Sequence, residues 1–430
     1  MGKNIVILFD GTSNEISADR TNILRLFGVL DRSDRQIVYY DPGVGTFGAA
    51  NAWSNAYRKT VELWGLATGW GLDQNVKEAY RFLVDNYEPG EPGDDQEYRD
   101  RDNIYIFGFS RGAYTARVLA GFVHSLGLMS KYHVNLIDYA YNTYKGISES
   151  EQQQGGADAA DVDWDAPSAF KTMRLYERTL KTDRPPIKLL GLFDTVSSVI
   201  VWGKWRPQLL TLPFTDRNPS VEVVRQALAI DERRTMFNPL PWRQGQDYWG
   251  GPFKPPAPPP QNVKEVWFSG VHGDIGGGYP EAESAAIKIP LAWMIAETRS
   301  TGLTYNNDAV NELVHGDNPT KSYVRPAPTA PLHDSMNWAW RLLEYVPRRV
   351  PITSWRKRGD TTRIYLPLAD RRFIPDGASL HQSVIDRLSS TTAPPYAPPN
   401  LPLRFETEPW SNDGPPPSED SEVVPITPAA

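Results

Sequence analysis

A serine flanked by two glycines stands out among the residues that could do chemistry. Residues 103–121 read NIYIFGFSRGAYTARVLAG, and Gly108, Ser110 and Gly112 form a G-x-S-x-G motif between a strand-like run and a helix-forming run. The motif is typical of a nucleophile elbow, a tight strand-to-helix turn in which larger flanking side chains would collide. It predicts Ser110 as a nucleophile; the competing interpretation is a glycine-rich turn whose serine caps the helix.

A serine nucleophile needs an adjacent base, and the chain has six histidines. His272 follows a strand-like run in VKEVWFSGVHGDIGGGY and precedes three glycines. This context predicts an imidazole on a loop at the carboxyl edge of a sheet, so His272 is the expected base. His381, in SLHQSVIDRL, is the alternative.

The acid of such a triad is expected between the serine and the histidine in chain order. Asp194 fits this order, because it ends the strand-like run IKLLGLFDTVSS. A carboxylate there could accept a hydrogen bond from the histidine and fix its tautomer. Asp274 is the alternative acid, but it lies two residues from His272 and is expected to order the following glycine loop.

Two loops are expected to supply the oxyanion hole. The backbone N–H of Arg111 opens the helix after the serine, where amides face developing negative charge. The first strand-like run ends in LFDGTSN, which offers the amides of Gly11 and Thr12 as the second donor. Asp10 either ties this loop down, hydrogen-bonds near Ser110, or only forms the turn.

These residues sit at the ends of short apolar runs, which suit strands buried on both faces of a parallel sheet. Between these runs lie segments whose apolar residues recur at helical spacing. Strands that alternate with helices predict an α/β fold that binds ligands at the carboxyl ends of its strands. The expected strands are Asn4 to Phe9, Gln36 to Tyr40, Asn103 to Phe109, Ile187 to Phe193 and Val263 to Gly270, and the clearest helices are Leu72 to Tyr87 and Gly112 to Leu128.

We expect one α/β-hydrolase-like domain over residues 1–387, with a mostly parallel sheet flanked by helices. Polar, acidic or proline-rich stretches predict loop or cap insertions near 89–102, 146–168 and 200–262. Residues 388–430 are rich in proline, and they are expected to form a tail that wraps the surface or stays disordered.

Composition excludes several classes of protein. The 430 residues carry a net charge of −7, which disfavours nucleic acid as a partner, and the absence of cysteine excludes thiol chemistry. No apolar stretch approaches the length of a membrane span. The start MGKNIVILFDGT lacks a signal-peptide core, so a cytoplasmic location is the default, while export by a specialised secretion machine stays open.

Taken together, these segments resemble an α/β-hydrolase domain family that includes type VI secretion phospholipase effectors. The resemblance implies a Ser-Asp-His triad, which maps onto Ser110, Asp194 and His272, and ester hydrolysis, with phospholipase activity in some members. Those effectors carry long additional segments that engage membranes, whereas the insertions here are proline-rich and acidic. The matching stretches are LFDGTSN, YYDPGVGT, GLDQNVKEAYRFL, IYIFGFSRGAYTARVLAG, GLFDTVSS, AIDERRTMFNP, WFSGVHGDIGGGY and LHQSVIDR.

The sequence therefore predicts a serine esterase, lipase- or phospholipase-like, that works through an acyl-enzyme without metal or cofactor. Its expected substrate is a small-molecule or lipid ester, with peripheral membrane contact and an undefined oligomeric state. Two alternatives remain open. The same triad supports amide or peptide hydrolysis, and a vestigial triad would leave a binding protein of the same fold.

Overall fold

The computed structural model of the chain describes most of its length. The described residues are 2–11, 19–43, 70–92, 98–147, 168–196, 200–202, 207–209, 212–250, 254–317, 323–349, 364–391 and 395–411. The chain folds into two compact units, each built from three segments. The first unit contains Met1–Ile16, Leu30–Arg225 and Leu240–Lys264, and the second contains Ser17–Val29, Gln226–Pro239 and Glu265–Ala430.

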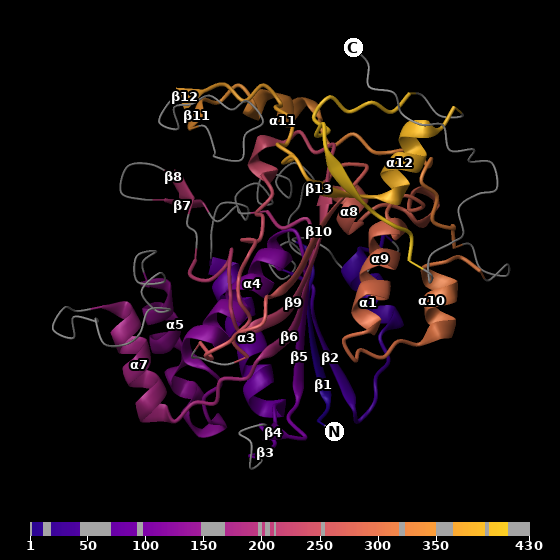
Figure 1. Ribbon diagram of the computed structural model, residues 1–430. Coiled ribbons are helices and arrows are strands. Elements are labelled where there is room, and N and C mark those ends of the chain that lie inside the picture. The colour runs from indigo at the N-terminus through magenta and orange to yellow at the C-terminus, as the bar shows by residue number, and fades with distance from the viewer. Residues whose placement is uncertain are drawn as a thin grey trace, which may run out of the picture. The chain divides into compact units, whose positions relative to one another are not determined.

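Eight of the described strands form one sheet, in the order β14-β13-β10-β9-β6-β5-β1-β2 (strands labelled in Figure 1). The pairs β1–β2, β1–β5, β5–β6, β10–β13 and β13–β14 are parallel. The predicted α/β class, with a mostly parallel sheet flanked by helices, is confirmed. The strands are β1 (Asn4–Phe9), β2 (Gln36–Asp41), β5 (Asn103–Phe109), β6 (Ile187–Phe193), β9 (Val221–Ala229), β10 (Asn262–Phe268), β13 (Ala378–His381) and β14 (Phe405–Glu408).

Outside this sheet, the described residues form three pairs of antiparallel strands: β3 (Glu91–Pro92) with β4 (Tyr98–Arg99), β7 (Ile200–Trp202) with β8 (Pro207–Leu209), and β11 (Arg348–Arg349) with β12 (Ile364–Tyr365). The described α-helices are α1 (Asn22–Val29), α3 (Trp70–Asn86), α4 (Arg111–Leu126), α5 (Ile137–Lys145), α7 (Ala169–Leu180), α8 (His272–Gly276), α9 (Lys288–Arg299), α10 (Asn307–Leu313), α11 (Trp338–Leu343) and α12 (Gln382–Ser389). Short 3₁₀ helices cover Lys131–Leu136, Thr235–Phe237 and Glu281–Glu283.

In the first unit, the apolar strands β1, β5 and β6 pack under helices α3 and α4, and α5 packs against α4. All six residues of β1 are buried, as the continuous apolar run NIVILF requires for a strand covered on both faces. Phe122 of α4 anchors the helix layer through ring contacts with Tyr80, Tyr141 and Tyr144, at centroid distances of 4.8, 5.3 and 5.4 Å.

The strand order of the first unit reverses at β1. The chain passes from β1 to its neighbour β2 on one side, and then returns to place β5 on the other side. In open parallel sheets such a switch point opens a crevice beyond the carboxyl ends of the two strands. Here those ends carry Asp10 and Ser110.

The second unit is held together by contacts far apart in sequence. Asn22 of α1 donates its side-chain amide to the carbonyls of Ile275 and Ile287, at 2.8 and 2.9 Å. The buried Arg25 pairs with Glu281 at 3.1 Å and donates to the Ser284 hydroxyl at 2.8 Å. The small segment around α1 is thereby fixed to residues some 250 positions further along the chain.

Two stretches that the sequence marked as peripheral contribute to the sheet. Residues 200–262 contain β9, which lies between β6 and β10. Residues 388–430 contain β14, which forms one edge of the sheet and pairs with β13 in register Ala378↔Phe405.

Candidate functional site

Ser110 occupies a sharp turn between β5 and α4. Its backbone has φ 58° and ψ −120°, a left-handed region that costs a non-glycine residue about 1–3 kcal/mol. A Cβ on Gly108 would approach the Gly112 carbonyl to 2.4 Å, and a Cβ on Gly112 would come equally close to the carbonyls of Phe9 and Asp10. Both glycines of the motif are thus required by close backbone approach.

Asp194 lies beside this turn at the end of the neighbouring strand. The register pairs Phe109 with Phe193, so Ser110 and Asp194 are the next residues on adjacent parallel strands. The Ser110 amide donates to the Phe193 carbonyl at 3.0 Å. Asp194 is fully buried and also has a positive φ, 43°. The two backbones therefore turn together at the carboxyl edge of the sheet.

Asp10 closes the loop that follows β1. Its carboxylate accepts the Gly11 amide at 2.6 Å and the Tyr40 hydroxyl at 2.9 Å. The Gly11 amide is therefore already used inside the loop, which weighs against Gly11 as an oxyanion donor. Thr12, the other expected donor of this loop, lies outside the described residues.

Helix α4 is fixed so that its first turn stays at the end of β5. The fully buried Arg117 donates to the carbonyls of Thr215 and Leu240, at 2.8 and 2.7 Å, and its guanidinium lies 5.2 Å from the Trp242 ring centroid. Arg111 begins the helix, and the first amides of a helix have no partner within it. Burial lowers the pKa of the Arg111 side chain to about 9.

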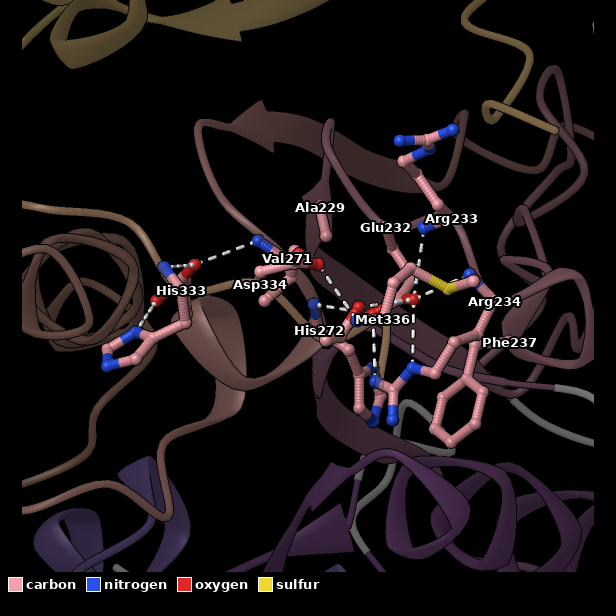
Figure 2. A network of polar contacts seen from close by, with 12 residues as sticks. Ala229, Glu232, Arg233, Arg234, Phe237, Val271, His272, His333, Asp334 and Met336 are labelled. Atoms are coloured by element: carbon pink, nitrogen blue, oxygen red, sulfur yellow. Dashed lines mark hydrogen bonds and ion pairs between the residues drawn. The ribbon is translucent and has the colours of Figure 1, made fainter. Parts of the chain in front are cut away.

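His272 begins α8 in the second unit, and it is buried. Its backbone amide donates to a carboxylate oxygen of Glu232 at 3.1 Å, as Figure 2 shows. Its ring packs edge-on against Phe237, with centroids 4.9 Å apart. Glu232 follows β9, so this strand positions the start of the histidine helix.

Glu232 is the centre of a dense polar network (Figure 2). Its side chain is 0% exposed. The carboxylate accepts two hydrogen bonds from Arg234, one from Nε at 2.9 Å and one from Nη2 at 2.8 Å. The hydroxyl of Ser335 donates to the same carboxylate at 3.0 Å. Burial by itself would raise the pKa of Glu232, but the hydrogen bond and charge of Arg234 overcome it and hold the pKa at about 2.

Asp274, the alternative acid, is engaged by a different histidine. His333 Nδ1 lies 2.6 Å from one carboxylate oxygen, and the Val271 amide donates to the other at 2.9 Å. The His333 ring also stacks on Tyr279, with centroids 3.5 Å apart, and its Nε2 lies 3.1 Å from Glu283. Asp274 therefore caps α8 and holds His333.

His381, the alternative base, caps a helix. Its Nδ1 accepts the Ser383 amide at 3.2 Å, which makes it the N-cap of α12. The ring stacks on Phe268 at 4.8 Å and meets Trp410 edge-on at 4.7 Å. Burial lowers the pKa of His381 to about 3, so this imidazole stays neutral and serves the packing of its helix.

Sequence reasoning did not single out Glu232, Arg234 or His333. Glu232 and Arg234 fall in AIDERRTMFNP, a stretch that carries part of the family resemblance but has no role predicted from its residues. The sequence feature that could have indicated them is a largely apolar run, typical of a buried strand, that ends in charged residues. Nothing in the sequence linked His333 to Asp274, since their contact spans 59 positions.

Metal-binding clusters and membrane-spanning helices are both absent from the part of the chain that the structure describes. No cluster of three or more histidine, aspartate or glutamate side chains there could hold a metal ion. Among the described helices, none combines the length and apolar character needed to cross a bilayer.

Comparison with known proteins gives a match over most of the chain. The model of the family described as T6SS, Phospholipase effector Tle1-like, catalytic domain, matches residues 3–297. The uncharacterized protein YEL023C of Saccharomyces cerevisiae is 34% identical over 246 residues, which are 56% of this chain and 32% of that protein.

Solved structures that resemble the chain include an uncharacterized protein from Pseudomonas aeruginosa, at 18% identity and a TM-score of 0.36, covering 71% of this chain and 46% of that one. A second is the Tle1 effector bound to the VgrG spike of the type 6 secretion system, at 19% identity and a TM-score of 0.33, covering 66% and 53%. The chain thus spans between a third and about half of the length of these relatives.

Proposed function

The chain belongs to the family of Tle1-like phospholipase effector catalytic domains, and from this premise we propose that it hydrolyses carboxylic esters of lipids with Ser110 as its nucleophile. The observation that carries the proposal is the backbone at Ser110. A strained serine between two glycines that tolerate no Cβ is costly to keep for a structural purpose alone.

The proposed reaction follows the serine-hydrolase scheme. Ser110 Oγ attacks the ester carbonyl while His272 takes its proton, and the Arg111 amide holds the oxyanion. His272 then returns the proton to the leaving alcohol, which departs and leaves an acyl-enzyme. Water, deprotonated by His272, releases the acid and restores Ser110. Asp194 orients the imidazole and balances its charge.

The register of β5 and β6 supports Asp194 over Asp274 as the acid. Asp194 is the residue next to Ser110 on the adjacent strand end, and it is fully buried. Both carboxylate oxygens of Asp274 instead have partners within the second unit, His333 and the Val271 amide. An acid committed to another imidazole is poorly placed to serve His272.

The first test is labelling with a fluorophosphonate probe, wild type beside Ser110→Ala. We expect labelling in the wild type and none in the variant. His272→Gln should abolish labelling as well, whereas His133→Gln, which changes an exposed histidine of the first unit, should label like the wild type. Equal labelling of wild type and Ser110→Ala would remove Ser110 from the reaction.

The second test separates the two acids. Asp194→Asn should lower kcat by about 10⁴-fold, the size seen when a triad acid loses its charge, and Asp274→Asn should retain most of the activity. The reverse pattern would exchange their roles. Measured with p-nitrophenyl esters, phospholipid vesicles and matched amides, the same proteins also report the substrate class, because turnover of amides alone would favour the peptidase alternative.

A further inference from the structure

Helix α11 shows the reverse of the usual polarity for a surface helix. Trp338, Leu342 and Tyr345 are spaced by four and three residues, so they share one face of the helix and its C-terminal extension. Their exposures are 76%, 61% and 64%. A face of large apolar side chains therefore points away from the core of the second unit.

The opposite face of the same segment is held inward. Glu344 is 1% exposed and accepts the Thr235 amide at 2.9 Å, together with the Thr235 hydroxyl. Trp340 lies against Phe237 with ring centroids 5.5 Å apart. The hydrogen bonds of Glu344 and the ring contact of Trp340 fix the rotation of the helix, and this rotation directs the three apolar side chains outward.

Three further exposed apolar residues lie in the segments next to the helix. Leu368 donates its amide to the Glu344 carbonyl at 3.1 Å, which brings the segment after β12 beside the end of α11, as Figure 1 also shows. Val346, Leu366 and Leu368 are 50%, 44% and 45% exposed. We call the six residues Trp338, Leu342, Tyr345, Val346, Leu366 and Leu368 the α11 patch.

The sequence around the patch is strongly basic in an otherwise acidic chain. Residues 337–358 contain one acidic residue, Glu344, which is buried and hydrogen-bonded, against a net charge of −7 for the whole chain. Of the basic residues there, Arg341 is exposed on α11 itself. The basic residues of this range are Arg341, Arg348, Arg349, Arg356, Lys357 and Arg358.

We propose that the α11 patch docks the protein on an anionic phospholipid surface. Trp and Tyr place their rings at the boundary between headgroups and acyl chains, and leucine enters the apolar layer beneath. Arginine extends its apolar stem along that layer and pairs with lipid phosphate. A second copy of this chain is a poorer occupant, because the exposed Arg341 of each copy would be brought towards the other across the shared face.

Docking on lipid would bring the proposed ester hydrolase to its substrate, and only this biological purpose rests on the proposed function. Trp340 and Phe237 link the inward side of α11 to His272, whose ring lies 4.9 Å from that of Phe237. The docking helix and the proposed base therefore belong to one packed cluster of the second unit. Binding to the lipid surface itself needs no turnover.

The test is vesicle flotation of the full chain carrying Ser110→Ala, so that no lipid is consumed. Vesicles of phosphatidylcholine with phosphatidylglycerol should retain the protein, and vesicles of phosphatidylcholine alone should retain much less. Trp338→Ser with Leu342→Ser should weaken binding about tenfold or more. Leu403→Ser, which removes a leucine that is 95% exposed elsewhere in the second unit, is the matched control and should bind like the parent.

A second variant separates charge from apolar contact. Arg341→Glu should weaken binding to the anionic vesicles while leaving the weak binding to phosphatidylcholine alone unchanged, and added salt should narrow the difference. An unchanged melting temperature of each variant establishes that folding is intact.

The proposal is overturned if the parent protein does not bind anionic vesicles, or if the double variant binds them like Leu403→Ser. Dissociation of a dimer by the double variant, with vesicle binding unchanged, would instead assign the patch to a second copy of the chain. If the wild type is not labelled by the probe but the Ser110→Ala chain binds anionic vesicles, only the proposed reaction is excluded. If the wild type is labelled but the Ser110→Ala chain does not bind these vesicles, only the docking surface is excluded.

Discussion

At the scale of single residues, the clearest constraint is the absence of space around the turn that carries Ser110. Main-chain atoms occupy the positions where Gly108 and Gly112 would carry a Cβ. Main chain cannot move aside as the end of a flexible side chain can. Packing therefore requires the two glycines of the motif, whatever reaction Ser110 performs.

Gly112→Ala tests this packing. The new methyl group would lie 2.4 Å from the Phe9 and Asp10 carbonyls, so the end of β1 must move. We expect a loss of about 2 kcal/mol in the free energy of unfolding and loss of labelling at Ser110. In Gly28→Ala the methyl group meets the end of the Leu313 side chain at 3.2 Å, and urea unfolding should place it within about 1 kcal/mol of the wild type.

Glu232→Gln tests the buried network at His272. Removing one partner of a buried ion pair leaves Arg234 without its counter-charge, and we expect a loss of about 3 kcal/mol at neutral pH. Glu222→Gln is the control, since its pair with Lys188 is partly exposed and should contribute less than about 1 kcal/mol. Equal losses in urea unfolding would contradict the assignment.

The same network predicts the direction of a pH effect. The pKa of Glu232 is held at about 2, below its usual 4.5, so on acidification the unfolded chain binds this proton first. The stability that Glu232 contributes is complete above about pH 4.5 and is lost as the pH falls towards 2. Urea unfolding over this range should show a smaller acid-induced loss in Glu232→Gln than in the wild type.

At the scale of elements, most of the sheet could be predicted from sequence. β1, β5 and β6 are continuous apolar runs with the predicted bounds, because strands buried on both faces need apolar side chains in both directions. β9 escaped prediction because VEVVRQALA carries charged and amide side chains, among them Arg225, whose guanidinium bonds to Asn262. β14, with the sequence FETE, is largely exposed and follows a proline-rich stretch.

The positions of Ser110 and Asp194 at one edge of the sheet were predictable for the same reason. Ser110 and Asp194 end two apolar strands, and parallel strands bring such ends to one edge. The partners of His272 and Asp274 could not be predicted, because their contacts close loops of 40 and 59 residues that leave no local pattern. The polarity of α11 inverts the rule on which helix prediction relies.

His333 provides a prediction for the contact between α8 and the loop before α11. Its hydrogen bond with Asp274 raises the pKa of His333 above 6.5, so the stability this pair contributes is complete below that pH and is lost as the pH rises through the raised value. NMR titration of the ring should give a midpoint above 6.5. In Asp274→Asn the midpoint should fall, and an unchanged midpoint would contradict the pairing.

At the scale of the whole molecule, the family inferred from short motifs is confirmed by a match across residues 3–297. Residues 388–430, which the sequence predicts to be a tail, include residues that pack against the rest of the second unit. Trp410, near the end of the described residues, packs edge-on against His381 and donates to Asp386 at 2.8 Å.

Trp410→Ala should therefore lower the free energy of unfolding by about 2 kcal/mol, since it removes a ring contact and a hydrogen bond. Leu403→Ser, only a few residues earlier, alters a leucine that is 95% exposed and should change stability by less than about 0.5 kcal/mol. Thermal unfolding of both variants is the measurement, and equal melting temperatures would show that the contacts of Trp410 carry no stability.

The attachment of α1 to residues 275–287 has a consequence for synthesis on the ribosome. The helix emerges early, yet the carbonyls and the carboxylate that satisfy Asn22 and Arg25 are translated about 250 codons later. The helices α8, α9 and α10, which contact α1 in the folded chain, are also made late, so we expect its apolar face to be exposed during synthesis and prone to aggregation. A chain released before that point would lack the groups that complete its second unit.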